Sequence, residues 1–349
     1  MSGPDAAPGS RMAAEIREQP AVWRRILSEA AAIGAAAACI RAARPRFVLL
    51  AARGTSDHAA LYGKYLAEIR CRLPAGLASP SAFTLYGAEP DLSGALVIAI
   101  SQSGASPDLV QTVEMARRRG ALTLALTNSP GSELAGAAEL ALDVHAGPER
   151  AVAATKSYTA QLLTLFLLLD WVAGSDGAAA GRLPDLGDAV LGVEPSLKGL
   201  AQRYRFAQRL VATARGYSHP TAREMALKLM ETCYVSAHAW SGADLLHGPL
   251  AMIDAEVPVI AVMADGPGGE AMQPVLERLR GIGADLFCVG ARRFVNGCEP
   301  CFTLPDGLDE CVSPILEILP LQLLTLHLAL ARGGNPDAPR GLSKVTQTL

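Results

Sequence analysis

A cluster of hydroxyl and amide side chains follows one apolar run of the sequence. The run "VIAI" leads directly into "SQSGAS", which contains Ser101, Gln102, Ser103 and Ser106. Pro107 suits the first turn of a helix, whose free N–H groups and dipole favour an anion. Hydroxyls, an amide and such N–H groups can together hold a phosphate. A single serine also suffices to cap a helix, so composition alone leaves capping and phosphate binding equally open.

The common nucleotide-binding motifs are absent around this cluster. The chain contains neither G-x-x-x-x-G-K-[ST] nor G-x-G-x-x-G, the patterns that cradle nucleotide phosphates. A small phosphorylated metabolite therefore fits the serine cluster better than a nucleotide. The same argument applies to Gly54-Thr55-Ser56, which follows the apolar run "FVLLAA".

A second group of residues suits acid–base chemistry. Glu224, Lys228 and Glu231 are spaced i, i+4 and i+7, which places them on one face of a predicted helix. Such a charged stripe is usually solvated, but the residues between are apolar, so we expect a mostly buried helix with side chains suited to proton transfer. By spacing alone His247 and Lys344 are weaker candidates for acid–base chemistry, because a lone histidine is often structural and a terminal lysine is ordinarily solvated.

Strands and helices alternate along the chain, and these elements must position the residues described above. Short apolar runs occupy residues 47–52, 96–101, 122–127 and 140–144, and helical patterns such as "ASPDLVQTVEMARRRG" lie between them. This alternation predicts an α/β fold with parallel sheets covered by helices. Ligands of open α/β sheets bind outside the carboxyl ends of the strands, where the serine cluster falls.

The chain contains an internal repeat. "ARGTS" begins at residue 52 and "ARGYS" at 214, while "VIAI" begins at 97 and "VIAV" at 259, so both pairs share an offset of 162 residues. We infer a duplicated α/β unit. The second copy ends its strand in Met263-Ala264-Asp265-Gly266 without hydroxyls, so we expect the fold to be doubled but not the site.

Composition excludes several classes of function. The net charge is −3 without a basic run, which argues against a nucleic-acid partner. Nothing at the amino terminus reads as a secretion signal, and the apolar segments 160–174 and 313–331 contain charged residues or proline, so we predict buried core helices, no membrane contact and a cytoplasmic location. Cys298 and Cys301 have C-x-x-C spacing but no second pair, so no metal is expected.

Several motifs, taken together, resemble one family. They are "EIREQP", "RGTS", "SQSG", "AVAATKSYTAQL", "EMALKLMETCYVSAHAWSGADLLHGPLAMIDAEVPVI" and "NPDAPRGLSKVT", spanning residues 15–345. The chain is similar to the double SIS (sugar isomerase) family, in particular to the isomerase half of glutamine–fructose-6-phosphate amidotransferase. The resemblance implies two tandem SIS domains, each a flavodoxin-like three-layer α/β/α unit. We predict an N-terminal helical segment at 1–35, SIS domains at 36–178 and 190–332, and a tail at 333–349 over the active site.

The resemblance also implies roles for individual residues. The phosphate would be held by Ser101, Gln102, Ser103 and Ser106. Thr55 and the backbone of Val152 and Ala153 would line the sugar.

The catalytic roles are carried over from the same family. Glu231 would move a proton between C1 and C2 of the sugar, with Lys228 beside it. His247, delivered from the neighbouring subunit of a homodimer, would open the sugar ring. Lys344 would reach over the site from the tail and engage the open-chain ketose.

The chain also departs from the synthase pattern. Ala154 stands where the synthase has a substrate-binding serine, Ala105 where it has glutamate, and Leu246 replaces the charged residue before the histidine. Only about 45 residues precede the first strand, which is too few for another domain. On that reading glutamine is not expected to be the nitrogen source.

These observations lead to a functional hypothesis. We predict a glucosamine-6-phosphate deaminase-type enzyme that forms fructose 6-phosphate and ammonia without a cofactor. One alternative is an aldose–ketose isomerase for another phosphosugar, of galactosamine or tagatose type. The other alternative is a non-catalytic phosphosugar sensor, which the first 46 residues disfavour because they show no basic recognition helix.

Overall fold

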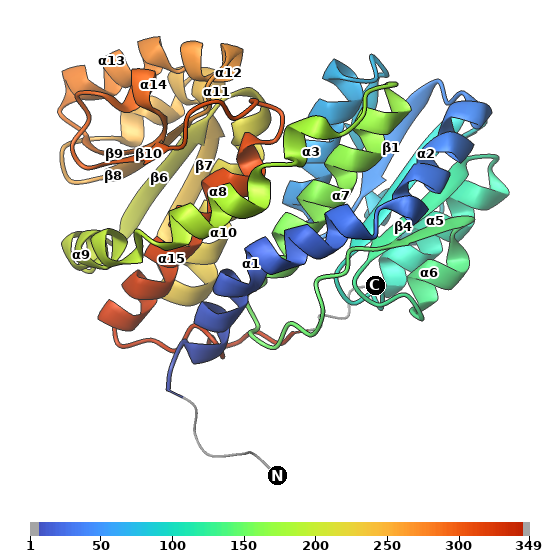
Figure 1. Ribbon diagram of the computed structural model, residues 1–349, viewed down its shortest axis with the longest axis horizontal. Helices are drawn as coiled ribbons and strands as arrows, with labels where there is room; N and C mark the ends of the chain where they lie inside the picture. Colours follow the sequence, from blue (N-terminus) through green and yellow to red (C-terminus); the bar gives the residue numbers. More distant parts are fainter. Residues whose placement is uncertain (1–6, 345–349) are drawn as a thin grey trace. The chain divides into compact units, whose positions relative to one another are not determined.

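The structure is a computed structural model that describes residues 7–344 (Figure 1). The chain divides into two compact units, each built on its own β-sheet. The first-sheet unit comprises residues 21–149, 156–181 and 343–344. The second-sheet unit comprises residues 7–20, 150–155 and 182–342.

Five parallel strands form the sheet of the first-sheet unit, in the order β2-β1-β3-β4-β5. They are β1 (Phe47–Ala51), β2 (Ala75–Leu77), β3 (Ala95–Ser101), β4 (Leu122–Thr127) and β5 (Leu140–Asp143). All seven residues of β3 are buried, as expected for a central parallel strand covered on both faces. The apolar runs predicted as strands coincide with β1, β3, β4 and β5.

Helices flank this sheet in two groups. One group packs α2 and α3 against α7, and the other packs α5 against α4 and α6 (Figure 1). The helices are α2 (Ala31–Ala43), α3 (Thr55–Ile69), α4 (Pro80–Thr84), α5 (Pro107–Arg118), α6 (Glu133–Ala137), α7 (Lys156–Val172) and the short η1 (Ala178–Ala180).

The second-sheet unit repeats this topology. Its parallel order β10-β9-β8-β6-β7, read from the other end, corresponds strand for strand to that of the first sheet. The strands are β6 (Arg209–Ala214), β7 (Ser236–Ser241), β8 (Pro258–Met263), β9 (Asp285–Ala291) and β10 (Cys301–Leu304). The predicted α/β repeat is therefore confirmed, and its two "VIA" segments form the equivalent strands β3 and β8.

Helices also flank the second sheet, where α15 packs against α8, α9 and α10. The unit contains α8 (Leu183–Leu191), α9 (Glu194–Tyr204), η2 (Gly216–Ser218), α10 (His219–Lys228), η3 (Leu229–Cys233), α11 (Gly242–Leu246), η4 (Pro249–Met252), α12 (Pro267–Glu270), α13 (Gln273–Ile282), α14 (Arg292–Val295) and α15 (Ser313–Ala331). The first eleven residues of α1 (Ser10–Ser28) also belong to it.

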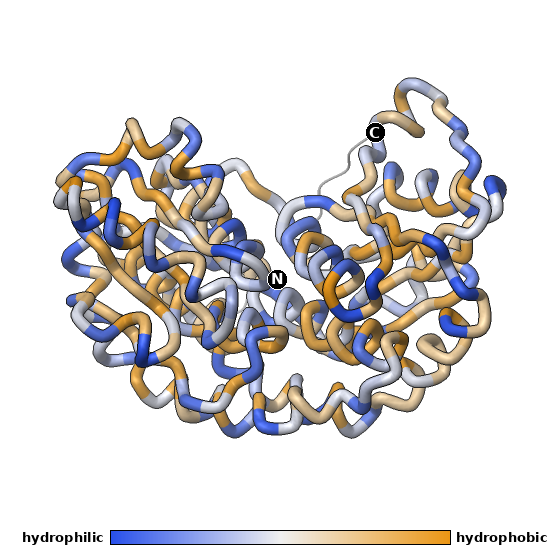
Figure 2. Tube along the Cα trace, turned by 90° about the horizontal axis from the view of Figure 1, so that it is seen from above, coloured by the Kyte–Doolittle hydropathy of each residue, from blue (hydrophilic) through white to orange (hydrophobic). Residues whose placement is uncertain are grey.

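The two long apolar helices α7 and α15 lie in the cores of their units. Helix α15 is long and apolar enough to cross a membrane, but 83% of that segment is buried within the protein. Residues 156–170 of α7 are buried as well, which confirms the prediction of core helices for both segments. Helices α1 and α2 are long and apolar enough only when taken together, as a pair bent by 58°. Figure 2 shows hydrophobic and hydrophilic stretches alternating along the trace, the pattern of elements with one inward face.

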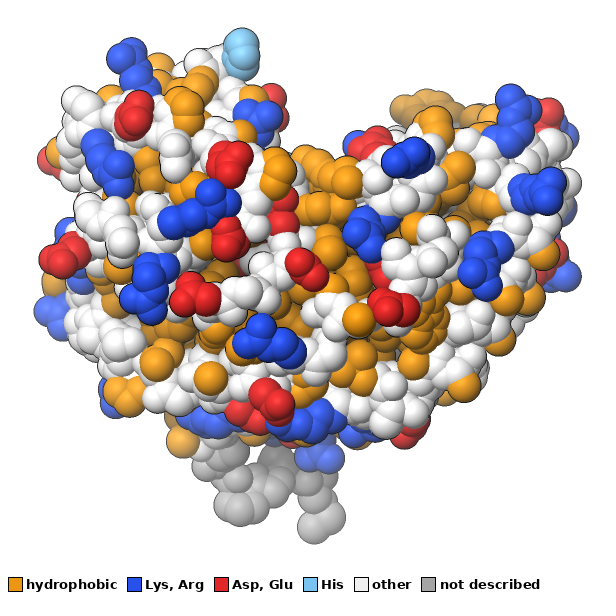
Figure 3. All heavy atoms as spheres, turned by 45° about the horizontal axis from the view of Figure 1, so that its top comes forward, with side chains coloured by type: hydrophobic (Ala, Val, Ile, Leu, Met, Phe, Trp, Pro, Cys, Tyr) orange, Lys and Arg blue, Asp and Glu red, His pale blue; other side chains and the backbone are white. Residues whose placement is uncertain are grey.

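Charged side chains of both signs are spread over one face of the molecule. On the face shown in Figure 3, Lys and Arg side chains are interspersed with Asp and Glu side chains. This distribution accords with the small net charge of −3.

Candidate functional site

The serine loop, residues 101–106, connects β3 to α5 at the carboxyl edge of the first sheet. Strand β1 lies between β2 and β3, so the chain leaves β1 toward one neighbour and later returns on the other side. Such a switch point is where open α/β sheets bind their ligands. The loop therefore lies where the sequence predicts a binding site.

The loop owes its shape to internal hydrogen bonds and one glycine. Ser101 Oγ accepts a bond from the Gly104 N–H at 3.1 Å, and Ser103 Oγ accepts one from the Ala105 N–H at 3.3 Å. Gly104 has a φ of +64°, and a Cβ there would lie 2.0 Å from Ser132 Oγ. Only glycine fits this left-handed, crowded position.

Ser106 occupies the N-cap position of α5, yet its side chain forms no capping hydrogen bond. The simple capping explanation for this serine is therefore not supported. Ser106, Ser103 and Gln102 are partly exposed, whereas Ser101 is buried at 6% exposure. Their hydroxyl and amide groups form a neutral set of donors at the start of a helix, an arrangement suited to an anion.

Thr55 begins α3 at the end of β1, the strand next to β3. The preceding Gly54 has a φ of +56°, which lets the chain turn from strand to helix. The neighbouring Ser56 is buried, and its Oγ accepts a hydrogen bond from Gln161 Nε2 at 3.0 Å. The two βα loops that carry predicted ligand-binding residues thus belong to adjacent strands.

Lys344 is anchored by a carboxylate that the sequence analysis did not single out. Its Nζ lies 2.9 Å from Oε2 of Glu149, whose side chain is completely buried. Ser157 donates two further bonds to this carboxylate, from its N–H at 3.0 Å and its Oγ at 2.7 Å. The position of Glu149 just before "AVAATK" was the only signal in the sequence.

The surroundings of Glu149 keep it ionised. Burial by itself opposes the charged form, but the Lys344 ammonium and the bonds from Ser157 outweigh it, so the pKa of Glu149 lies below its usual value. The result is a buried ion pair that fixes the lysine of the tail.

In the second-sheet unit, Lys228 lies between two carboxylates. Its Nζ is 2.5 Å from Glu231 Oε2 and 3.4 Å from Glu224 Oε1. The side chains of Lys228 and Glu224 are 1% and 0% exposed, whereas Glu231 is 22% exposed. Of the three, Glu231 is thus the group that solvent or a ligand can reach.

The backbone at Glu231 differs from the predicted single α-helix. Helix α10 ends at Lys228, and residues 229–233 form the π-helical turn η3. A π turn widens the helix and recurs at functional sites. The Lys228–Glu231 contact therefore spans the junction between α10 and this π turn.

His247 ends the short helix α11 and is exposed to solvent. Gly248, which follows, has a φ of +137°. His247 belongs to the same second-sheet unit as Lys228 and Glu231.

The loop 150–155, which contains Val152 and Ala153, is held from two sides. Glu15 of α1 accepts hydrogen bonds from the N–H groups of Arg150 and Ala151. The Val152 N–H donates to the carbonyl of Asp337 at 3.2 Å. Glu15 of "EIREQP" and Asp337 of "NPDAP" thus hold this loop in place.

The counterpart of the serine loop in the second sheet is filled by a side chain of the chain itself. Glu310 Oε1 accepts a hydrogen bond from the Gly268 N–H at 2.8 Å. A Cβ on Gly266 or on Gly268 would lie 2.4 or 2.5 Å from this carboxylate. The loop after β8 is therefore occupied by Glu310. The doubled fold is confirmed, and the expectation of a single site stays a prediction.

The predicted residues thus fall into two sets. Within the first-sheet unit lie Thr55, Ser101, Gln102, Ser103, Ser106 and Lys344. Within the second-sheet unit lie Val152, Ala153, Lys228, Glu231 and His247.

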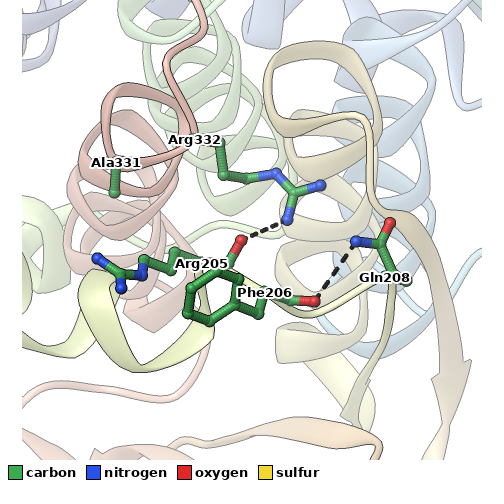
Figure 4. A pocket seen from close by; sticks show the side chains of 5 residues that line it. All are labelled: Arg205, Phe206, Gln208, Ala331 and Arg332. Carbon is green, nitrogen blue, oxygen red and sulfur yellow. Dashed lines mark hydrogen bonds between the residues drawn. The ribbon is translucent and has the colours of Figure 1, made fainter.

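A surface pocket of the second-sheet unit contains none of these residues (Figure 4). Arg332 donates to the Arg205 carbonyl at 2.7 Å, and the Arg205 guanidinium lies 4.4 Å from the centre of the Phe206 ring. Gln208 and Ala331 complete the lining. Arg332 is thus committed to backbone carbonyls at the end of α15.

The C-x-x-C pair forms no disulfide bond. Cys298 accepts a hydrogen bond from Arg280 at 2.9 Å. Residues 7–344 contain no group of three or more His, Cys, Asp or Glu side chains placed to hold a metal ion.

Comparison with known proteins identifies relatives over most of the chain. Residues 43–169 and 204–275 match the family model described as "SIS domain". A glutamine–fructose-6-phosphate aminotransferase (isomerizing) from Thermococcus kodakarensis is 36% identical over 308 residues, which cover 85% of this chain and 51% of that protein. The chain therefore spans about half the length of this relative.

Two solved structures share the fold. A candidate phosphosugar isomerase from Silicibacter pomeroyi is 34% identical, with a TM-score of 0.85 over 93% of this chain and 99% of that one. The C-terminal domain of glucosamine-fructose-6-phosphate aminotransferase from Francisella tularensis has a TM-score of 0.83 over 95% of this chain and 99% of that one. At 24% identity, this second likeness concerns the fold alone.

Proposed function

The chain belongs to the SIS domain family, with homology to the isomerase half of glutamine–fructose-6-phosphate aminotransferase, and on that premise we propose a specific reaction for it. It is a deaminase-type aldose–ketose isomerase that converts glucosamine 6-phosphate and water to fructose 6-phosphate and ammonia.

The serine loop binds the sugar phosphate in this proposal. Ser106 supports the assignment because it sits at the N-cap of α5 without capping it. The hydroxyls and the Gln102 amide donate hydrogen bonds to phosphate oxygens at the start of a helix, whose dipole favours an anion. Thr55 and the backbone of Val152 and Ala153 line the sugar.

Glu231 is the proton-transfer base, and its contact with Lys228 is the observation that carries the proposal. The carboxylate is held at 2.5 Å by a buried ammonium, which also faces Glu224, yet it remains accessible at 22% exposure. A positioned carboxylate base contributes typically 10²–10⁴-fold to such a reaction.

The proposed steps conserve atoms and protons. His247 of the neighbouring subunit in a homodimer helps to open the ring. Glu231 takes the proton from C2 of the open-chain aldehyde and returns it to C1, while one proton of the amine passes to O1. The amino aldose thereby becomes a ketose imine. Lys344, held by Glu149, engages the open-chain sugar. Water then adds at C2, ammonia leaves, and fructose 6-phosphate remains.

Ammonia release tests the proposal directly. Purified protein is incubated with glucosamine 6-phosphate, and both ammonia and fructose 6-phosphate are measured. We expect wild type and the exposed-surface control Glu277→Gln to form both products in equal amounts, and Glu231→Gln to lose the activity. Wild type that binds glucosamine 6-phosphate without forming products contradicts the proposal.

The second candidate is an aldose–ketose isomerase for a phosphosugar of galactosamine or tagatose type. Ala154 favours it, because the synthase has a substrate-binding serine at this position and the sugar preference depends on such contacts. The same Glu231 would transfer the proton. Conversion of a tagatose or galactosamine phosphate without action on glucosamine 6-phosphate would decide for this candidate.

A further inference from the structure

Arg53 is fixed beside the serine loop by an ion pair. Its Nε and Nη2 atoms each lie 2.8 Å from Oδ2 of Asp108. The Asp108 side chain is 1% exposed, whereas that of Arg53 is 48% exposed. One end of the pair is thus buried in the fold and the other faces solvent.

The two residues come from the loops that flank the switch point of the first sheet. Arg53 lies between β1 and Thr55, and Asp108 lies in the first turn of α5, two residues after Ser106. Strands β1 and β3 pair directly, with Ala51 opposite Ala99. The guanidinium is therefore held against the helix turn that begins at the serine loop.

The pair leaves part of the guanidinium free to bind an anion. Arginine has five N–H donors, and Asp108 engages nitrogens Nε and Nη2 through a single oxygen. The other carboxylate oxygen of Asp108 accepts the Leu109 N–H at 2.9 Å. Asp108 thus orients Arg53 without using all of its donors.

We propose that Arg53 is a phosphate-binding residue of the serine loop, positioned by Asp108. This inference rests on the proposed function and adds the positive charge that the hydroxyl cradle lacks. A phosphate monoester carries close to two negative charges at neutral pH, and arginine matches its oxygens with a planar fork of donors. Arg53 thereby selects phosphorylated over neutral sugars.

Binding of inorganic phosphate and of glucosamine 6-phosphate, measured by calorimetry, tests this role. We expect Arg53→Ala to weaken both affinities by roughly 10- to 100-fold, the usual loss for a charge-assisted hydrogen bond. Arg53→Lys keeps the charge but not the planar fork of donors, so its affinities should lie between those of wild type and of Arg53→Ala. The matched control is Arg203→Ala, which removes another half-exposed guanidinium, paired with Asp285 at 2.7 Å in the second-sheet unit.

A pH series separates anion binding from a purely structural role. The second phosphate proton dissociates near pH 6, so wild-type affinity for glucosamine 6-phosphate should rise between pH 5 and about 7.5. Arg53→Ala should flatten this rise, and Asp108→Asn should weaken binding several-fold because Arg53 loses its anchor.

The outcomes distinguish this inference from the proposed reaction. Unchanged phosphate affinity in Arg53→Ala overturns the role of Arg53, even where wild type releases ammonia. Weakened binding in Arg53→Ala with no ammonia release by wild type supports Arg53 and contradicts the deaminase. Failure of wild type to bind either phosphate compound overturns both.

Discussion

Lys344 and Glu149 are 195 positions apart in the chain, yet Nζ of the lysine lies 2.9 Å from Oε2 of the glutamate. The glutamate is completely buried and the lysine is 24% exposed. A terminal lysine is ordinarily solvated and adopts many conformations. This ion pair gives Lys344 a defined place within the first-sheet unit.

Replacement of Glu149 should release the lysine of the tail. We expect Glu149→Gln, which keeps the shape but not the charge, to lower the rate of ammonia release roughly tenfold through loss of one charge-assisted bond. Steady-state kinetics on glucosamine 6-phosphate measure the change.

The same variant should change the pH dependence of stability. The pKa of Glu149 is lower in the folded protein than in the unfolded chain, where it is 4.5. The stabilisation that Glu149 provides is therefore present above pH 4.5 and is lost as the pH falls through the pKa of the folded protein. Wild type should therefore exceed Glu149→Gln in Tm near pH 7, and the gap should narrow in acid. A difference in Tm between the two proteins that stays constant from pH 7 into acid would argue against the ion pair.

Lys228 should matter for stability as well as for catalysis. Lys228→Met removes the ammonium that faces the completely buried Glu224, and loss of one partner of a buried pair costs about 3–5 kcal/mol. Urea denaturation measures the change.

A double variant separates the two roles of this lysine. Glu224→Gln/Lys228→Met removes both buried charges, so we expect it to regain much of the stability without regaining activity. Recovery of activity together with stability would show that Lys228 has only a structural role.

Glu317 should make stability fall as pH rises. Its side chain in α15 is fully buried and accepts bonds from Ser218, Thr221 and Ser313. Burial raises the pKa of Glu317 to about 7 despite these bonds. The folded protein therefore holds the proton more tightly than the unfolded chain, whose value is 4.5.

The sign of this effect follows from proton linkage. The contribution of Glu317 is complete below pH 4.5 and is lost as pH rises through about 7, a change of about 3 kcal/mol. We expect Glu317→Gln to reduce this loss between pH 5 and 8 in urea denaturation. The variant of an exposed residue, Glu277→Gln, should show the same pH dependence of stability as wild type. If all three proteins have the same dependence of unfolding free energy on pH, Glu317 has no such role.

Mixed dimers test whether two subunits share the active site. Glu231→Gln and His247→Ala chains should each be inactive alone. After subunit exchange, half of the dimers are mixed and each has one intact pair of residues, so up to about a quarter of wild-type activity should return. No activity in mixed dimers verified by differential tags would contradict the delivery of His247 from a partner.

Local sequence patterns determined the general plan of this protein. Buried parallel strands are continuous apolar runs, so β1, β3, β4 and β5 could be recognised in the sequence, and the offset between "ARGTS" and "ARGYS" revealed the repeat. The serine loop could be placed because the carboxyl ends of parallel strands form the ligand-binding edge. Glu231 could be singled out by its helical spacing, whereas its role and the importance of His247 and Lys344 came from the family resemblance.

Only the tertiary structure decided the partners of the charged side chains. The pairs Arg53–Asp108 and Glu149–Lys344 join residues 55 and 195 positions apart, and no periodicity encodes such contacts. The π turn at residues 229–233 depends on packing that an i, i+4 pattern does not report. Charge pairing depends on distance and burial, and these are properties of the folded chain rather than of its local sequence.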